Sequence, residues 1–311
     1  MYIFMAKGCL HMFLLGEILA AGVSVCDAAC CSLLNSVEAR ISTFTINFVK
    51  LVAAALFVFL LRLALAGTAG IPLLPAAGWL WLAASGLIGY VLGDMMFIGS
   101  FRHIPYRLSM VIYYTNPVVT TLAAFLLFGQ RVTVLQLCGI VLTIGGTALA
   151  LLFGSRRQDE GGRRLWKRGL LLAFLAMLAQ GANVLMSMRA ADLLGELPGK
   201  TLLCSQIRQL AGLLGFGVYG LVRGFLPRLR KEIRGRAMAR IALGGIAGNG
   251  LGPVLLLQSL QYVPAGISTA LASLSPLLVI PVSVVLFHDR IRFAEILGAC
   301  ITVAGVILLS V

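Results

Sequence analysis

The most regular feature of this chain is a succession of long apolar segments separated by short polar ones. There are ten, near residues 12–34, 43–64, 78–100, 104–128, 133–153, 168–188, 201–222, 239–260, 264–286 and 293–311. A helix needs roughly 20 apolar residues to cross a hydrocarbon core of about 30 Å. Lipid-exposed irregular backbone is excluded, and continuous apolar runs do not fit the alternating strands of a membrane barrel. The pattern predicts an all-α integral membrane protein with ten transmembrane helices.

The second half of the chain repeats the first at a spacing of 159 residues. Five helices per copy is an odd number, so the second copy must be inverted in the membrane relative to the first. Inverted repeats are typical of transporters with a site near the membrane mid-plane, between the copies. The matched residues include Gly86 and Gly245, Gly89 and Gly248, Gly93 and Gly252, Pro105 and Pro264, Ser109 and Ser268, Pro117 and Pro276, and Gly146 and Gly305.

Two polar, basic segments interrupt the apolar pattern. The first, residues 154–166, lies between the copies, and the second, residues 223–240, lies between the seventh and eighth blocks. We therefore expect a first five-helix repeat over 12–153, a basic linker over 154–166, and a second five-helix repeat over 167–311.

The net charge of +14 comes from basic residues in short loops. Such residues orient membrane helices, so we expect no nucleic-acid partner. Loops after odd-numbered blocks carry 18 Lys and Arg residues, and the opposite side carries 5. The bias places the odd loops in the cytoplasm and both termini outside. We expect a multi-pass protein of the inner or plasma membrane, surrounded by membrane lipid, as a monomer or homodimer.

Repeated motifs carry a family resemblance. His103-Ile104-Pro105 through Asn116-Pro117, then Phe128-Gly129-Gln130-Arg131, then Gly139 to Gly146 return as Tyr262-Val263-Pro264 through Ser275-Pro276, then His288-Asp289-Arg290, then Gly298 to Gly305. This arrangement resembles the ten-helix EamA-type branch of the drug/metabolite transporter superfamily, which has two tandem EamA domains. The resemblance covers about 12–311. It implies transport of a small molecule and a central cavity lined by the first helix.

The chain departs from the family pattern in two places. The family's turn of Gly, Glu and a basic residue is Gly129-Gln130-Arg131 in one copy and His288-Asp289-Arg290 in the other. The loop 67–78 carries no charge, whereas family members commonly have a basic loop there and a cytoplasmic N-terminus. Either this chain has the opposite of the usual family orientation, as the count of positive residues predicts, or its first helix is drawn wrongly.

Four charged residues fall well inside predicted spans. Lys50 and Arg208 occupy matching places in the second and seventh helices, and Asp27 and Asp94 lie in the first and third. A charge at mid-bilayer costs about 2.5–3.5 kcal/mol on insertion scales, so it usually faces a cavity or a partner. The two cations either attract an anion or carboxylate or anchor helix ends. The two carboxylates either exchange a coupling proton or form a structural ion pair, for example with Lys50. We favour Asp27 for the proton and a structural role for Asp94.

Uncharged candidates complete the predicted substrate and ion pathway. Asn116-Pro117 and Ser275-Pro276 should break the fourth and ninth helices and leave carbonyl groups free near mid-membrane. Small residues four apart allow close helix approach or movement. The neutral polar candidates, for substrate binding or interhelical hydrogen bonds, are Tyr113, Tyr114, Gln180, Asn183, Asn249 and Gln258, and the packing or hinge candidates are Gly89, Gly93, Gly248, Gly252 and Pro253.

The sequence has no glycine-rich phosphate loop, no metal-ligand spacing and no nucleophile elbow. We therefore expect no enzyme, no cofactor and no metal. We expect a secondary active transporter that exports a small metabolite or amino-acid-like compound by alternating access, coupled to a proton or an exchange gradient. The alternatives are a flippase or carrier for a lipid-linked sugar, a membrane-embedded enzyme, and a non-transporting membrane scaffold.

Overall fold

The computed structural model describes residues 2–38, 40–66, 74–128, 133–154, 160–195, 199–232, 235–259, 262–263, 271–287 and 292–310. Every regular element in these ranges is helical, so the predicted all-α class is confirmed. The elements are α1 (Tyr2–Glu38), α2 (Thr43–Ala66), α3 (Ala76–Gly86), η1 (Leu87–Gly93), α4 (Asp94–Ser100), α5 (Tyr106–Tyr113), α6 (Asn116–Phe128), α7 (Val134–Gly154), α8 (Glu160–Leu193), α9 (Lys200–Val222), α10 (Leu226–Glu232), α11 (Arg236–Gly245), η2 (Ile246–Leu251), α12 (Gly252–Ser259), α14 (Ser275–Phe287) and α15 (Phe293–Ser310).

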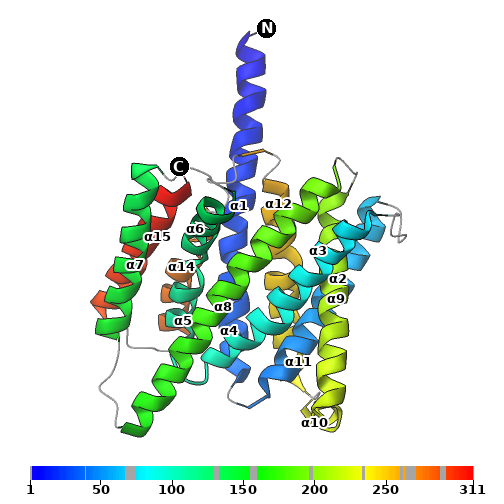
Figure 1. Ribbon diagram of the computed structural model, residues 1–311, viewed down its shortest axis with the longest axis vertical. Coiled ribbons are helices and arrows are strands. Elements are labelled where there is room, and N and C mark those ends of the chain that lie inside the picture. Colours follow the sequence, from blue (N-terminus) through cyan, green and yellow to red (C-terminus); the bar gives the residue numbers. More distant parts are fainter. Residues whose placement is uncertain are drawn as a thin grey trace.

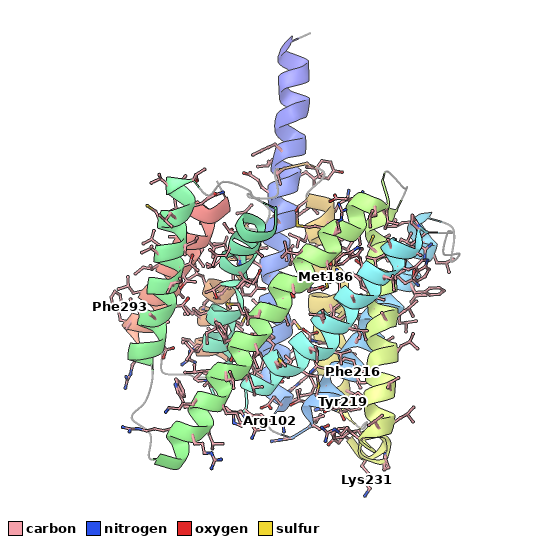
Figure 2. All side chains as sticks on the ribbon, viewed as in Figure 1. Arg102, Met186, Phe216, Tyr219, Lys231 and Phe293 are labelled. Carbon is pink, nitrogen blue, oxygen red and sulfur yellow. The ribbon has the colours of Figure 1, made fainter. Side chains whose placement is uncertain are left out.

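The exterior of the bundle is apolar. Among the described residues, five helical stretches are long and apolar enough to cross a membrane: Phe13–Glu38, Thr43–Leu65, Ala76–Ser100, Gly162–Ala190 and Arg236–Ser259. Two shorter apolar helices, Val134–Ala150 and Phe293–Leu308, accompany them. Large apolar side chains are exposed, such as Leu214 at 72% and Phe293 at 76%. Phe293 points outward from the bundle in Figure 2. Extended apolar surface marks contact with a membrane, so this is a multi-pass membrane protein.

The two halves of the chain interlock instead of forming separate bundles. Helix α1 packs against α11, η2, α12 and α14 of the second half, while α8 packs against α3, η1, α4, α5 and α6 of the first half. Helix α2 contacts α9, and α7 lies along α15 (Figure 1). The contacts of α1 with α11, η2, α12 and α14 thus match those of α8 with α3, η1, α4 and α6, and the polar residues of both halves meet inside one bundle.

Helices α7 and α15 pack at backbone contact through glycines that recur in the repeat. A Cβ atom on Gly146 would lie 2.4 Å from the amide nitrogen of Thr302, and one on Gly305 would lie 2.4 Å from that of Thr143. Real Cβ atoms do not approach other atoms this closely. The four residues form a reciprocal interface, because 159 positions separate Thr143 from Thr302 and Gly146 from Gly305.

The predicted break in the fourth helix lies between α5 and α6, where Pro117 falls in the first turn of α6. The carbonyl groups there are not free. The carbonyl oxygen of Ile112 accepts a hydrogen bond from Oγ1 of Thr115 at 2.6 Å, and that of Tyr113 accepts one from Nδ2 of Asn116 at 3.0 Å. The expectation of free carbonyls is wrong at these two positions, because the side chains of Thr115 and Asn116 donate to them, as does the backbone N–H of Thr115 at Ile112.

At Pro276, in the first turn of α14, side chains also donate to a backbone carbonyl that lacks its helical N–H donor. The carbonyl oxygen of Ala272 accepts hydrogen bonds from Oγ of Ser275 at 2.8 Å and from Oγ of Ser24 at 3.0 Å. Ser24 belongs to α1, so here the bond also joins the two halves of the chain. Free carbonyls at this break are likewise excluded for Ala272.

The basic segments are shorter and more helical than the apolar pattern predicts. Helix α8 begins at Glu160, so Arg163 and Arg164 lie on its first turns, and the second segment contains α10. Apolar periodicity cannot reveal a helix that continues past the membrane as a polar end. The start of α8 and the whole of α10 lie at the same end of the molecule, the lower end in Figure 1, opposite the two termini.

Candidate functional site

The two halves each contain a π-helical segment, and these segments begin 159 residues apart, at Leu87 in η1 and Ile246 in η2. Short π segments inside α-helices occur frequently at functional sites. A Cβ atom on Gly86, just before η1, would lie 2.2 Å from the carbonyl oxygen of Arg208. A Cβ atom on Gly245, just before η2, would lie 2.2 Å from that of Lys50. The backbone of each buried basic residue therefore packs directly against a glycine of the opposite half.

Lys50 and Asp94 form a buried ion pair. Nζ of Lys50 lies 2.7 Å from Oδ2 of Asp94, and the two side chains are 3% and 14% exposed. Nδ2 of Asn249, in η2, donates to the same carboxylate oxygen at 2.9 Å. Asn47, one turn before Lys50, donates to the backbone carbonyl of Asp94 at 3.3 Å. Of the two carboxylates that the sequence offered, Asp94 is the partner of Lys50.

Arg208 has a different environment from its repeat counterpart. Its Nη2 donates to Oδ1 of Asn183 at 2.9 Å, and Nδ2 of Asn183 donates to Oε1 of Gln180 at 3.1 Å. The guanidinium carbon lies 5.5 Å from the ring centroid of Tyr90, in η1. Within the described part of the chain, Nε of Arg208 and the hydroxyl of Tyr90 are buried without a hydrogen-bond partner. The contacts of Arg208 are therefore to neutral groups.

Asp27 forms the third part of this polar centre. Its carboxylate accepts a hydrogen bond from the hydroxyl of Tyr114, between α5 and α6. It lies beside η2 and α12, since a Cβ atom on Gly252 would be 3.5 Å from its Oδ1. Asp27 is also within electrostatic range of Lys50 and Asp94. We define the polar centre as Asp27, Tyr90, Asp94, Tyr114, Lys50, Asn183, Arg208 and Asn249.

The close-packing glycines hold helices of opposite halves together around the polar centre. A Cβ atom on Gly89 would lie 2.8 Å from Cγ of Asn183, and one on Gly248 would lie 2.6 Å from Sγ of Cys30. Gly93 faces Ala179 of α8 at 3.4 Å in the same way. Their positions explain the four-residue spacing of small residues, because α8 and α1 cross η1 and η2 at these points.

Other predicted candidates lie around the polar centre or away from it. The ring of Tyr113 stacks on Phe97 with centroids 4.3 Å apart. Pro253 is the second residue of α12, directly after Gly252. Gln258 donates to the hydroxyl of Tyr262 at 3.3 Å, close to the end of α12.

Sequence reasoning missed Tyr90 as part of the site and also missed Gln209. Gln209 is fully buried, and its Nε2 donates to the backbone carbonyl of Asn249 at 2.8 Å, which supports η2. The repeat could have identified Tyr90, because it lies 159 positions before the candidate Asn249.

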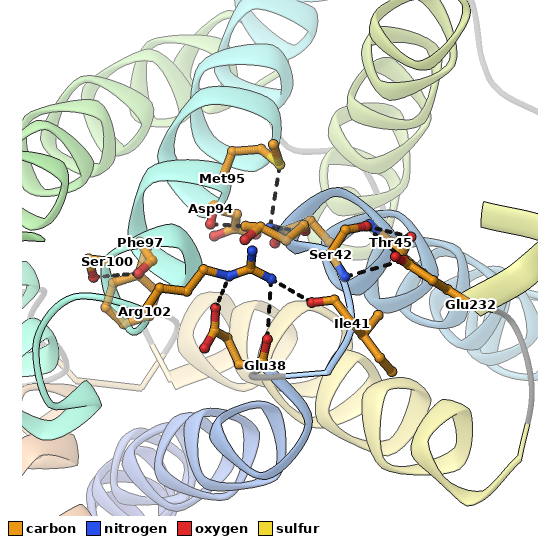
Figure 3. A network of polar contacts seen from close by, with 12 residues as sticks. Glu38, Ile41, Ser42, Thr45, Asp94, Met95, Phe97, Ser100, Arg102 and Glu232 are labelled. Atoms are coloured by element: carbon orange, nitrogen blue, oxygen red, sulfur yellow. Dashed lines mark hydrogen bonds and ion pairs between the residues drawn. The ribbon is translucent and has the colours of Figure 1, made fainter. Parts of the chain in front are cut away.

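A polar network joins the end of α1 to the segment after α4 (Figure 3), and its Arg102 lies in the lower part of the molecule in Figure 2. The guanidinium of Arg102 binds the carboxylate of Glu38, and its Nη2 donates to the carbonyl of Ile41 at 2.6 Å. Oγ of Ser42 donates to Oε2 of Glu232 in α10 at 2.7 Å. This lower-end network joins three chain connections below the polar centre.

The comparisons with known proteins decide the family. The model of the EamA-like transporter family matches residues 14–152 and again residues 167–311. The chain belongs to the EamA-like transporter family. The resemblance seen in the sequence motifs is thus confirmed, and members of this family are membrane transporters. No curated protein matches the chain.

This EamA-family chain is similar in fold to a protein whose crystal structure has been solved. Its TM-score is 0.67 at 15% sequence identity, and the similarity covers 95% of this chain and 98% of that one. Identity this low carries the fold alone. Among the described residues there is no group of three His, Cys, Asp or Glu side chains that could hold a metal ion.

Proposed function

We propose that this EamA-family protein is a secondary active transporter that exports a small metabolite or amino-acid-like compound by alternating access. The observation that carries the proposal is the polar centre itself. Lys50, Asp94, Asp27 and Arg208 lie inside a bundle with an apolar exterior, where each charge costs several kcal/mol in the absence of a partner or a cavity. Replacing such groups by apolar residues would often leave stability unchanged or increase it, so a binding role explains their presence better than a stabilising one.

The proposed architecture is ten spans in two inverted five-helix repeats, residues 12–153 and 167–311, joined by 154–166. The reciprocal contacts of Gly86 with Arg208 and of Gly245 with Lys50 support it, because a pseudo-two-fold relation generates both from one contact. The polar centre then lies where the repeats cross. Basic residues favour the cytoplasm, and Arg102 and Lys231 both lie at the lower end, so we place that end inside (Figure 2).

The lower-end network supports a role in alternating access. It joins the ends of α1 and α4, which both carry residues of the polar centre, and so closes this side of the site in the present conformation. Opening toward the cytoplasm would separate Glu38 from Arg102. Water already reaches the Arg102 side of this pair, since the side chains of Arg102 and Glu38 are 41% and 7% exposed.

Coupling is proposed to run through a proton on Asp27. Its hydrogen bond to Tyr114 is compatible with a carboxylate that gains and loses a proton, whereas Asp94 is engaged in an ion pair with Lys50 at 2.7 Å. The small-molecule substrate and the coupling proton would then occupy neighbouring parts of one polar centre.

Reconstitution of the purified protein in sealed lipid vesicles tests the proposal. Vesicles loaded with a mixture of unlabelled amino acids and organic acids should accumulate labelled members of that mixture by exchange. Gly217→Ala, which meets nothing within 4 Å, is a control that should behave as wild type, whereas Gly245→Ala should lose exchange because the halves no longer meet. Chemical conversion of a solute without vesicles would favour a membrane-embedded enzyme instead.

A further inference from the structure

The two repeat-related cations, Lys50 and Arg208, differ in whether a carboxylate lies beside them. Lys50 pairs with Asp94 of its own repeat, and Asn249 of the other repeat donates a hydrogen bond to the same carboxylate. The position 159 residues after Asp94 is Pro253, which has no carboxylate. The second copy of the site therefore lacks the anion that the first copy has.

Arg208 consequently carries a positive charge with no salt bridge among its contacts. It is 8% exposed, and within the described ranges its side chain contacts Asn183 and Tyr90, which are both neutral. A buried guanidinium without an anion is costly, and its planar fork of donors matches a carboxylate in geometry. Its Nε–H is buried without a hydrogen-bond partner among the described residues, while Nη2 donates to Asn183.

Tyr90 supplies a second unused group beside the first. Its hydroxyl is buried without a hydrogen-bond partner in the described chain, and the tyrosine side chain lies within electrostatic range of Arg208. Buried polar groups are nearly always paired, so two unpaired ones on facing elements point to a missing partner. The repeat again agrees, since Tyr90 corresponds to Asn249, the residue that donates to Asp94 in the other copy.

We infer that Arg208 and Tyr90 bind a carboxylate group of the transported solute. This carboxylate takes the place of the one that the second repeat lacks, because Pro253 stands where the first repeat has Asp94. The inference rests on the proposed transport function and specifies the class of substrate: a solute with a single planar carboxylate. Nε–H of Arg208 and O–H of Tyr90 donate to its oxygens. The present conformation, with both side chains buried, is the closed form of this subsite.

The binding test uses matched probes that differ by one group. L-leucine has an ammonium and a carboxylate, 4-methylpentanoate has only the carboxylate, and 3-methylbutylamine has only the ammonium. At constant ionic strength, both carboxylates should raise the thermal unfolding midpoint of the detergent-purified protein in a concentration-dependent way. The amine and inorganic phosphate should not. No shift with either carboxylate, an equal shift with the amine, or a shift with phosphate alone would overturn the assignment.

Four variants locate the effect. Arg208→Gln should abolish the shift, and Tyr90→Phe, which keeps the ring over the guanidinium, should weaken it. Pro253→Asp restores an internal anion and should abolish the shift, whereas the neutral control Pro253→Asn should retain it. If both Arg208→Gln and Pro253→Asp kept the full shift in unfolding midpoint, the subsite would be excluded. If Arg208→Gln does not fold, the weaker shift expected for Tyr90→Phe still tests the subsite.

Transport by the same preparations separates this inference from the proposed function. Carboxylate binding that depends on Arg208, without movement of any solute into sealed vesicles, would reject transport and leave the subsite in place. Transport with an unchanged KM for carboxylates in Arg208→Gln would reject the subsite and leave transport in place.

Discussion

Lys50 and Asp94 form an ion pair of 2.7 Å inside the apolar bundle, with the lysine side chain only 3% exposed. The pair joins α2 to α4, and Asn249 binds the same carboxylate from the second half. Because Asn249 connects the pair to the second half, the pair stabilises the arrangement in which the polar centre exists. The structural role that the sequence favoured for Asp94 remains a prediction, and this pair supplies a mechanism for it.

Breaking this pair should destabilise the protein. Asp94→Asn leaves Lys50 buried and uncompensated, and loss of one partner of a buried pair costs about 3–5 kcal/mol. We expect a lower thermal unfolding midpoint and lower expression. The double variant Lys50→Met/Asp94→Asn removes both charges and should recover most of the loss. An Asp94→Asn protein as stable as wild type would contradict the structural role.

Asp27 should be separable from Asp94 by its effect on coupling. We expect Asp27→Asn to abolish transport driven by a pH gradient and to leave solute exchange partly intact, because only the proton-carrying group is lost. Tyr114→Phe, which removes its hydrogen-bond donor, should shift the pH dependence without abolishing it. The measurement compares pH-driven uptake with exchange in one vesicle preparation. Equal loss of both activities in a well-folded protein, or no loss at all, would remove Asp27 from the coupling role.

The contact of α10 with the α1–α2 connection should resist acid. Burial alone would raise the pKa of Glu232, but hydrogen bonds from Thr45 and Ser42 outweigh this effect and lower the pKa below its usual value of 4.5. A lowered pKa means that the stabilising contribution is present above 4.5 and is lost as the pH falls through the lowered value. Hydrogen exchange at the Ser42 amide, followed from about pH 6 to about pH 3, should show protection lost only near the acidic end. Glu232→Gln should show no such transition; a wild-type transition well above 4.5 would contradict the prediction.

The α7–α15 interface offers a test by adjacent glycines. Gly146→Ala places a Cβ atom 2.4 Å from the backbone of Thr302, whereas Gly145→Ala meets nothing within 4 Å. Overpacking typically costs about 1–3 kcal/mol. Gly146→Ala should therefore lower the thermal unfolding midpoint, and Gly145→Ala should leave it unchanged or raise it slightly. Equal midpoints for the two variants would show that the helices are not in backbone contact.

The sequence predicted the parts of the fold that depend on composition and repetition. The apolar blocks predicted where the helices lie. The repeat identified Lys50 and Arg208 as residues at matching places in the two copies. It could not choose between Asp27 and Asp94 as the partner of Lys50, because that choice depends on how α1 and α4 pack around α2. Tyr90 was overlooked because an aromatic residue in an apolar block is typical of a helix core. The start of α8 was placed too late because its first turns are polar.

Alternating access to the polar centre is the central claim, and accessibility of one buried position tests it most directly. Ser205 is fully buried one turn before Arg208, and its hydroxyl has no partner among the described residues. In a Cys204→Ala background, Ser205→Cys can be treated with a membrane-impermeant maleimide in sealed vesicles of either orientation, and the modified peptide measured by mass spectrometry. We predict modification from both sides of the membrane, because the site opens to each in turn. Modification from one side only, or from neither, would contradict the transporter.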